Sequence, residues 1–174
     1  MSRDSRTLHA PTRNLYTSSQ SPLAICAVFL AYIVRDIATF DDLVDWGKIM
    51  GAVGAFRYLL LYAFRNTNLT SESINRWYIA FVSSLMLSGA AWGSATFLLA
   101  PTVSGIDQAI VILFISGFVA GAAAAFAGDR LAFAAFALPA VSLPIYNLLM
   151  NGDPVAQKIA VVVGFFAVFL LASA

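Results

Sequence analysis

From about Trp77 to Ala100 the chain runs without a charged side chain. A helix of this length crosses the hydrocarbon core of a bilayer, which is about 30 Å thick. An open strand is excluded there, because lipid offers no hydrogen bonds to unpaired backbone groups. Gly89 and Gly93 lie four residues apart within the run and share one helical face, which lets a second helix approach closely. The stretch predicts a membrane helix that packs tightly against a neighbour.

Other apolar runs extend this prediction to the whole chain. Hydrophobic residues make up 60% of the sequence and charged residues 11%, whereas soluble domains carry about 25% charged residues. The alternating pattern of a membrane barrel is absent. We therefore expect an all-α integral membrane bundle. It has a polar tail at residues 1–21 and six transmembrane helices at about residues 22–40, 44–64, 77–99, 106–127, 131–150 and 155–174.

Basic residues in the loops predict the orientation. If the tail and the second and fourth loops are cytoplasmic, that side holds Arg3, Arg6, Arg13, Arg65, Arg76 and Arg130. The other side then holds only Lys48 and Lys158 outside the crossings. Cytoplasmic loops are enriched in Lys and Arg, so we expect both termini in the cytoplasm. The last apolar run ends without a basic flank, and we expect any further chain to emerge on the cytoplasmic side.

Small residues, prolines and aromatic residues suggest how the helices pack. Gly117 and Gly121 form a second small-residue face, for which we expect helix packing as for Gly89 and Gly93. Pro139 and Pro144 predict a kink in the fifth helix. Near the predicted helix ends we expect a belt of aromatic residues at the two membrane interfaces, namely Trp46, Trp77, Tyr78 and Tyr146.

Several kinds of chemistry are excluded by composition. The chain has one cysteine, Cys26, and one histidine, His9, which lies in the polar tail. An internal disulfide, a thiol-rich metal site and bis-histidine haem ligation are therefore impossible within one chain. No catalytic triad and no pair of carboxylates inside the crossings is present. We expect no enzyme activity, no metal, no cofactor and no binding of nucleic acid.

Arg57 and Trp92 are the candidates for a binding site. An arginine inside a crossing is costly unless it reaches an interface, water or a partner. Arg57 therefore either faces a cavity and pairs with an anionic ligand or a carboxylate, or it snorkels toward the cytoplasmic headgroups. Trp92 either stacks on an apolar ligand or packs against the small-residue face of another helix. The adjacent Arg35 and Asp36 are expected to form an interfacial pair.

Several residues recur in a familiar order along residues 44–174. They are Arg57 with Tyr62, then Trp77, Gly89 with Trp92-Gly93, Asp107, Gly117, Ala120-Gly121, and Pro139 with Pro144. This order resembles the N-terminal six-helix membrane input region of bacterial sensor proteins, namely hybrid histidine kinases and diguanylate cyclases. The resemblance implies a place in the bacterial cytoplasmic (inner) membrane and adds Tyr62 to the ligand-binding candidates. No kinase, cyclase or phosphorelay segment is present in the sequence.

Two functions follow as expectations. The first is a sensory input domain of a bacterial signal-transduction protein, such as a two-component system. It would bind a small apolar or amphipathic signal, shift between two helix packings and relay the change through its last helix. The second is a non-catalytic accessory or structural subunit, derived from a sensor and packed in a larger membrane complex. The expected partners are the lipid bilayer, a small-molecule ligand, and either further copies of the chain or the other subunits of a complex. A small transporter has the least support.

Overall fold

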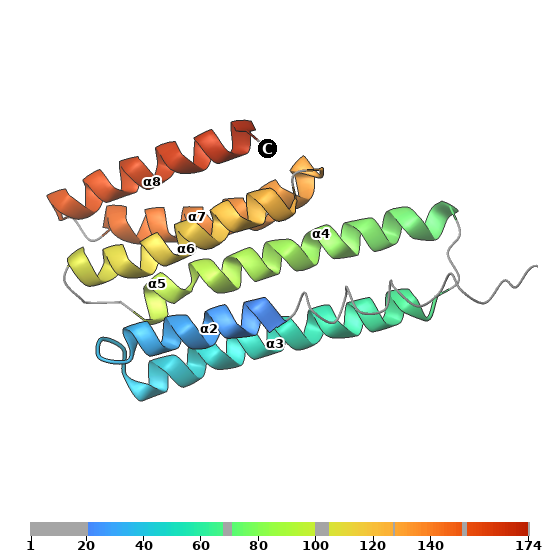
Figure 1. Cartoon of the computed structure of the whole chain (residues 1–174), viewed down its shortest axis with the longest axis horizontal. Helices are drawn as coiled ribbons and strands as arrows, with labels where there is room; N and C mark the ends of the chain where they lie inside the picture. Colours follow the sequence, from blue (N-terminus) through green and yellow to red (C-terminus); the bar gives the residue numbers. More distant parts are fainter. Residues whose placement is uncertain (1–20, 68–70, 100–104, 127, 151–152, 174) are drawn as a thin grey trace, which may run out of the picture. The chain divides into compact units, whose positions relative to one another are not determined.

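All the regular structure in the described part of the chain is helical (Figure 1). The computed structural model describes residues 21–67, 71–99, 105–126, 128–150 and 153–173. The predicted all-α class is confirmed, whereas residues 1–20 of the predicted polar tail lie outside the described residues. The helices are α2 (Ser21–Val34), α3 (Phe40–Arg65), α4 (Ser71–Gly93), α5 (Ala95–Leu98), α6 (Gly105–Ala125), α7 (Arg130–Met150) and α8 (Pro154–Ser173).

Four stretches within the described residues are long and apolar enough to cross a membrane, as expected of a membrane protein. They are Ser73–Leu98, Gln108–Ala125, Arg130–Met150 and Pro154–Ser173, and they coincide with the last four of the predicted crossings. The apolar part of α2, Ile25–Val34, is shorter than the roughly 20 residues that a crossing needs. Helix α3 is long enough, but charged residues are spread along it. Crossing by α2 and α3 stays a prediction.

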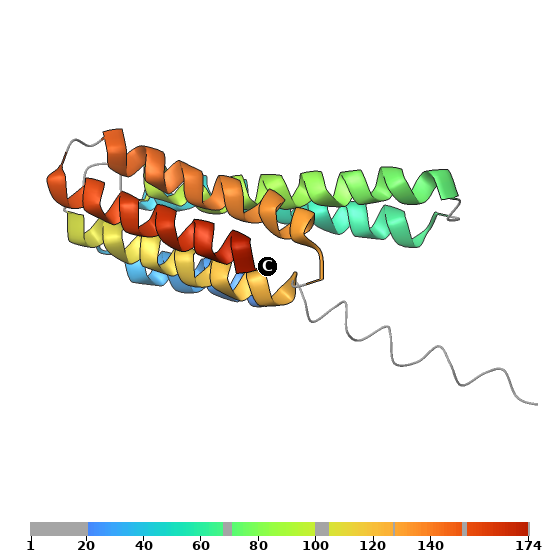
Figure 2. The same cartoon turned by 90° about the horizontal axis from the view of Figure 1, so that it is seen from above.

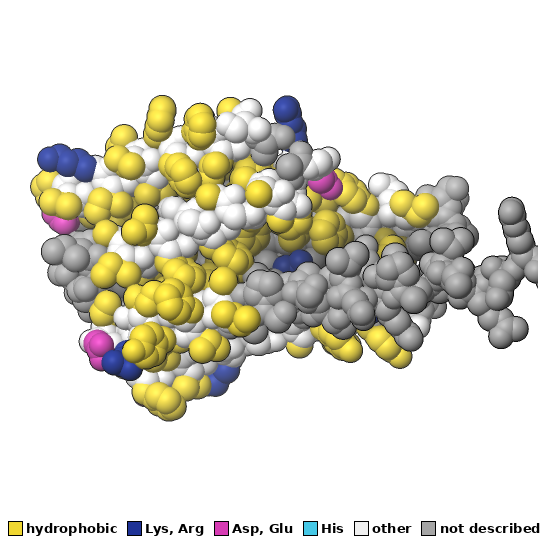
Figure 3. Space-filling model, in the orientation of Figure 1, with side chains coloured by type: hydrophobic (Ala, Val, Ile, Leu, Met, Phe, Trp, Pro, Cys, Tyr) yellow, Lys and Arg dark blue, Asp and Glu magenta, His cyan; other side chains and the backbone are white. Residues whose placement is uncertain are grey.

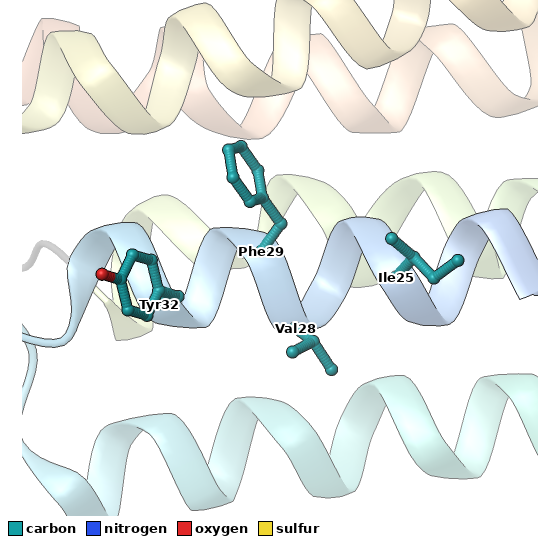
Figure 4. Close-up of a pocket in the computed structure, with 4 residues that line it drawn as sticks. All are labelled: Ile25, Val28, Phe29 and Tyr32. Atoms are coloured by element: carbon teal, nitrogen blue, oxygen red, sulfur yellow. The ribbon is translucent and has the colours of Figure 1, made fainter.

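The chain divides into two compact units, residues 1–33 and residues 34–174, which are described separately. The described part of the first unit is α2. Four of its side chains line a surface pocket, and all of them are more than half exposed: Ile25, Val28, Phe29 and Tyr32 (Figure 4). Their spacing places them on successive turns of the helix, and the Tyr32 hydroxyl is the single polar side-chain group among them.

Helix α3 begins earlier than the sequence pattern indicated. Thr39 caps it: its Oγ1 accepts a hydrogen bond from the Asp42 N–H at 3.2 Å, and the Asp42 carboxylate accepts one from the Thr39 N–H at 3.3 Å. This reciprocal arrangement is a capping box. Asp41 and Asp42, which lie between the predicted crossings 22–40 and 44–64, are therefore in the first turn of a helix, where negative charge is favourable.

The segment between α2 and α3 contains the Arg35–Asp36 pair. The two side chains are 3.6 Å apart and both are mostly exposed. Helix α2 ends at Val34, so the pair follows the helix and does not lie within it as the predicted range 22–40 implied. An exposed pair of this kind contributes little to stability.

Helix α4 is central to the packing of the second unit. It packs most extensively against α7, which in turn packs against α8, while α3 packs on α4 (Figures 1 and 2). Helix α6 also contacts α7 and α8, and the apolar core of the unit includes the buried residues Leu85, Ile115, Phe133 and Leu148. Both views show α3 and α4 continuing side by side past the ends of α6 and α8.

The outer face of α8 is strongly apolar. Five of its large side chains are 60–76% exposed: Val161, Val162, Phe165, Val168 and Phe169. Figure 3 shows hydrophobic side chains over much of the visible surface of α6 and α8. Contiguous apolar patches of this kind are rare on soluble monomers and mark surfaces that contact lipid or protein.

Candidate functional site

Gly89 and Gly93 form the closest contact between α4 and α7. A Cβ atom on Gly89 would collide with the Phe136 carbonyl oxygen and would lie 2.9 Å from Cγ of Pro139. A Cβ on Gly93 would lie 2.7 Å from the Pro139 carbonyl oxygen. Only glycine allows the two backbones to approach this closely, as in other membrane helix pairs. The sequence indicated a close contact here, and the structure assigns the partner as α7.

Gly117 and Gly121 lie differently from the expected packing positions. A Cβ atom on either would meet no described atom within 4 Å. The buried face of α6 contains Ile115 and Val119 instead. Gly117 is two positions beyond Ile115, about 200° around the helix, and therefore faces away from that core. Among the described residues these two glycines make no close helix contact.

Pro139 and Pro144 both lie inside α7, which is assigned as one continuous helix. A proline inside a helix has no N–H, so the carbonyl groups of Ala135 and Ala140 lose their usual helical donors. The Pro139 ring lies against Gly89, and Pro144 is buried. The first proline therefore forms part of the contact between α4 and α7.

The third predicted crossing is interrupted at Ser94. Helix α4 ends at Gly93, and the short helix α5 begins at Ala95. Gly/Ser pairs are among the sites where helices kink. Carbonyl groups around the break accept hydrogen bonds from side chains: the Ser94 hydroxyl donates to the Ala91 carbonyl at 2.8 Å, and the Thr96 hydroxyl donates to the Gly93 carbonyl at 2.9 Å.

Side chains of two other helices also bind the carbonyls at this break. Trp46 Nε1 of α3 donates to the Ala91 carbonyl at 3.1 Å. Asn147 Nδ2 of α7 donates to the Thr96 carbonyl at 2.8 Å. Backbone carbonyl groups that lack helical donors inside a membrane are tolerated where other protein groups donate to them, and these side chains do so. The predicted crossing at residues 77–99 is therefore not one unbroken helix, and the Gly93-Ser94 pair is the sequence feature that marks the break.

Trp92 lies in a cluster of aromatic rings next to the break. Its ring centroid is 4.5 Å from that of Phe118, 5.6 Å from that of Trp46 and 6.1 Å from that of Phe114. Trp92 is 1% exposed and Trp46 2%. The prediction that Trp46 lies in an interfacial belt is wrong: its N–H group has a buried carbonyl partner, and its ring meets Trp92 edge-on.

Arg57 of α3 points toward α4. Its side chain is half-buried, and Nη1 donates a hydrogen bond to the Ser88 hydroxyl at 3.3 Å. The Ser88 hydroxyl itself donates to the Ser84 carbonyl at 2.9 Å, so it serves Arg57 only as an acceptor. Ser88 lies one helical turn before Trp92, on the same face of α4. The structure therefore places the charged end of Arg57 close to the aromatic cluster.

The helical rise gives the position of this contact along α4. The Tyr78 hydroxyl donates to the Asp129 carboxylate at 2.9 Å, and that carboxylate also accepts the Ala132 N–H at the start of α7. Tyr78 therefore marks the level at which α7 begins. Between residues 78 and 88 the helix rises about 15 Å. Ser88 thus lies about half of a 30 Å hydrocarbon core away from that level.

No carboxylate among the described residues pairs with Arg57. The ion pairs found there join Arg35 to Asp36 and Lys48 to Asp45. Side chains on a helix lean toward its N-terminus, so Arg57 leans away from the Arg65 end of α3. This direction is opposite to the one that snorkelling toward the cytoplasmic headgroups requires.

Tyr62, the third candidate, is not brought together with the other two. It is 62% exposed. It lies five positions after Arg57, about 140° around α3. Arg57 and Trp92 thus lie near each other through Ser88, and Tyr62 belongs to a different surface of the helix.

Comparison of the chain with protein-family models, with curated proteins and with solved structures finds no match. Among the described residues, no group of three or more His, Cys, Asp or Glu side chains is placed to hold a metal ion.

Proposed function

We propose that this chain is a membrane-embedded sensory input domain of a bacterial signal-transduction protein. In this proposal α2 and α3 cross the cytoplasmic membrane together with the other long helices, giving six crossings with both termini in the cytoplasm. The domain has no catalytic activity of its own. It binds a small apolar or amphipathic signal and passes the change to its last helix.

The break at Ser94 is the observation that carries this proposal. It lies between two helices whose side chains, Trp46 and Asn147, bind its carbonyl groups. An interrupted helix held by a few exchangeable hydrogen bonds is an element that can occupy two arrangements. Small shifts at such an element become larger movements, because packed helices adopt discrete positions.

Packing contacts in the second unit connect this element to α8. Helix α4 contacts α7 backbone to backbone at Gly89 and Gly93. Helix α7 packs along α8, where a Cβ on Gly164 would lie 3.7 Å from Cδ1 of Ile145. A change in α4 therefore alters the surface against which α8 packs, and α8 would carry the signal toward the cytoplasm.

The orientation proposed here follows the basic residues. Arg65 ends α3, and Arg130 begins α7. Arg76 lies in the first part of α4. The opposite end of the second unit holds Lys48 and Lys158. The excess of arginine at one end supports the cytoplasmic assignment of that end.

The intact mass of the protein taken from its native membrane tests the proposal. An input domain requires an output segment, so we expect a mass well above 18.6 kDa. A mass near 18.6 kDa together with co-purifying membrane subunits would contradict it.

An accessory subunit is the second candidate, and one observation favours it. Gly117 and Gly121 leave a small-residue face open on α6. A helix of another subunit, or of a second copy of the chain, fits such a face. Crosslinking from a cysteine placed at Gly117 would identify this partner.

A further inference from the structure

We propose that Arg57 binds the oxyanion of an amphipathic ligand, a carboxylate or a phosphate carried on an apolar chain, at the contact between α3 and α4. The inference rests on the proposed function only in taking this ligand as the signal. Binding itself requires no output domain.

Arg57 has more hydrogen-bond donors than its contacts in the structure use. A guanidinium has several N–H donors in a planar fork that matches a carboxylate or phosphate. Here one donor is used, and its partner is the neutral hydroxyl of Ser88. The described residues supply no carboxylate to the remaining donors. Inside a membrane such a charge is costly unless an interface, water or a partner stabilises it, and an anion would serve as that partner.

The position of Arg57 determines what kind of anion reaches it. Ser88 lies about 15 Å along α4 from the level of Tyr78, within the part of the helix that is apolar enough to span a membrane. A small hydrophilic anion does not partition into the apolar interior of a bilayer. An anion joined to an acyl chain partitions into the bilayer and brings its own apolar surface.

Small residues lie beside the guanidinium on both helices. Ser84 and Ser88 are the α4 residues on the side of Arg57, and their hydroxyls bond to carbonyls of their own helix. On α3, Gly54 lies one turn before Arg57, and a Cβ placed there would meet no described atom within 4 Å. Arg57 leans over this turn, where none of the described residues occupies the space beside Gly54.

Ser88 acts as a positioning residue in this arrangement. Its proton is donated to the Ser84 carbonyl, and its lone pair accepts from Arg57. It therefore holds one edge of the guanidinium and leaves the other N–H groups directed elsewhere. Trp92, one turn further along α4, is close enough to report on a ligand that binds there.

Quenching of tryptophan fluorescence by dibrominated stearate tests the proposal. The full chain is reconstituted in phosphatidylcholine vesicles, and the acid is compared with its methyl ester, which has the same chain without the charge. We expect saturable quenching by the acid beyond that by the ester. In Arg57→Gln the apparent affinity for the acid should fall by about tenfold or more, because a charge-assisted pair is lost.

Two variants serve as controls. Arg65→Gln removes a charge from the end of α3 and should leave the acid-specific quenching unchanged. Ser88→Ala keeps the charge and removes the hydroxyl that positions it, so the affinity should fall by a smaller factor, about threefold. This variant also keeps the test valid if Arg57→Gln fails to fold.

A competition step identifies the source of the oxyanion. If phosphatidylglycerol in the vesicles removes the acid-specific quenching, the site takes a lipid headgroup. If it does not, the site takes the free acid, and both outcomes support the proposal. Equal quenching by acid and ester, or equal quenching in Arg57→Gln and the original chain, would overturn it. A native mass near 18.6 kDa would remove the sensor function and leave this binding result intact.

Discussion

Gly89 of α4 lies so close to the Phe136 carbonyl of α7 that no side chain fits between the two backbones. We expect Gly89→Ala to destabilise the bundle by about 1–3 kcal/mol, because α7 must move to admit a methyl group. Thermal unfolding in detergent measures the effect. Gly117→Ala is the matched control: its Cβ meets open space, and alanine favours the helix by up to about 1 kcal/mol. Equal stability of the two variants would contradict the assigned contact.

The Trp46 side chain provides a second test. Trp46→Phe keeps an aromatic ring beside Trp92 and removes the N–H donated to the Ala91 carbonyl. We expect a loss of about 1 kcal/mol in the free energy of unfolding, the usual net contribution of one such hydrogen bond. Trp77→Phe serves as the control, since Trp77 meets Phe64 far from the break. If Trp46 occupied an interfacial belt, the two variants would behave alike.

Asn147 should matter mainly for the short helix α5. Asn147→Leu preserves much of the volume and leaves the buried Thr96 carbonyl without its side-chain donor. We expect the free energy of unfolding to fall by about 1–3 kcal/mol. Hydrogen exchange should become faster at residues 95–98 and change less in the other helices. Ser142→Ala, on an exposed position of α7, is the control. A uniform rise in exchange over all helices would instead indicate global destabilisation.

The capping box at the start of α3 gives a local prediction. Thr39→Ala removes the hydroxyl that accepts a hydrogen bond from the Asp42 N–H. We expect the free energy of unfolding to fall by about 1 kcal/mol. Hydrogen exchange should increase in the first turn of α3 and stay unchanged at Arg65. Thr39→Ser keeps the hydroxyl and should retain most of the protection. Loss of protection in both variants would show that the hydroxyl does not cap the helix.

The helical class and the four most apolar spans could be predicted from the sequence. A long uncharged run in lipid must satisfy its own backbone hydrogen bonds, and a helix does so. The contact of Gly89 and Gly93 was readable as a helix contact, but its partner was not. Small residues show where a helix can approach and do not show which helix does. For Gly117 and Gly121 the sequence did not even predict whether they face the core. Helix α6 is apolar on every side, so its pattern does not identify the inward face.

The environment of the candidate site was harder to predict. Tryptophan suits both a membrane interface and a polar contact in the interior, so the position of Trp46 near charged residues was misleading. The break at Ser94 leaves hydropathy unchanged and depends on donors from α3 and α7 that are distant in sequence. The direction in which the Arg57 side chain leans could be predicted in part. Side chains on a helix lean toward its N-terminus, which in α3 is the end that holds Trp46.

Two hydrogen-bonded contacts limit how α4, α5 and α7 can move, one from α4 to Asp129 just before α7 and one from α7 to α5. Tyr78 binds Asp129 at one end, and Asn147 binds the Thr96 carbonyl at the other. Sliding of one helix along the other would break both bonds and force Gly89 past the Phe136 carbonyl. Flexing at Ser94 breaks neither the Tyr78 contact nor the glycine contact. Helix α4 is therefore held rigidly against α7 along most of its length, and bending is confined to Ser94, next to the tryptophan rings.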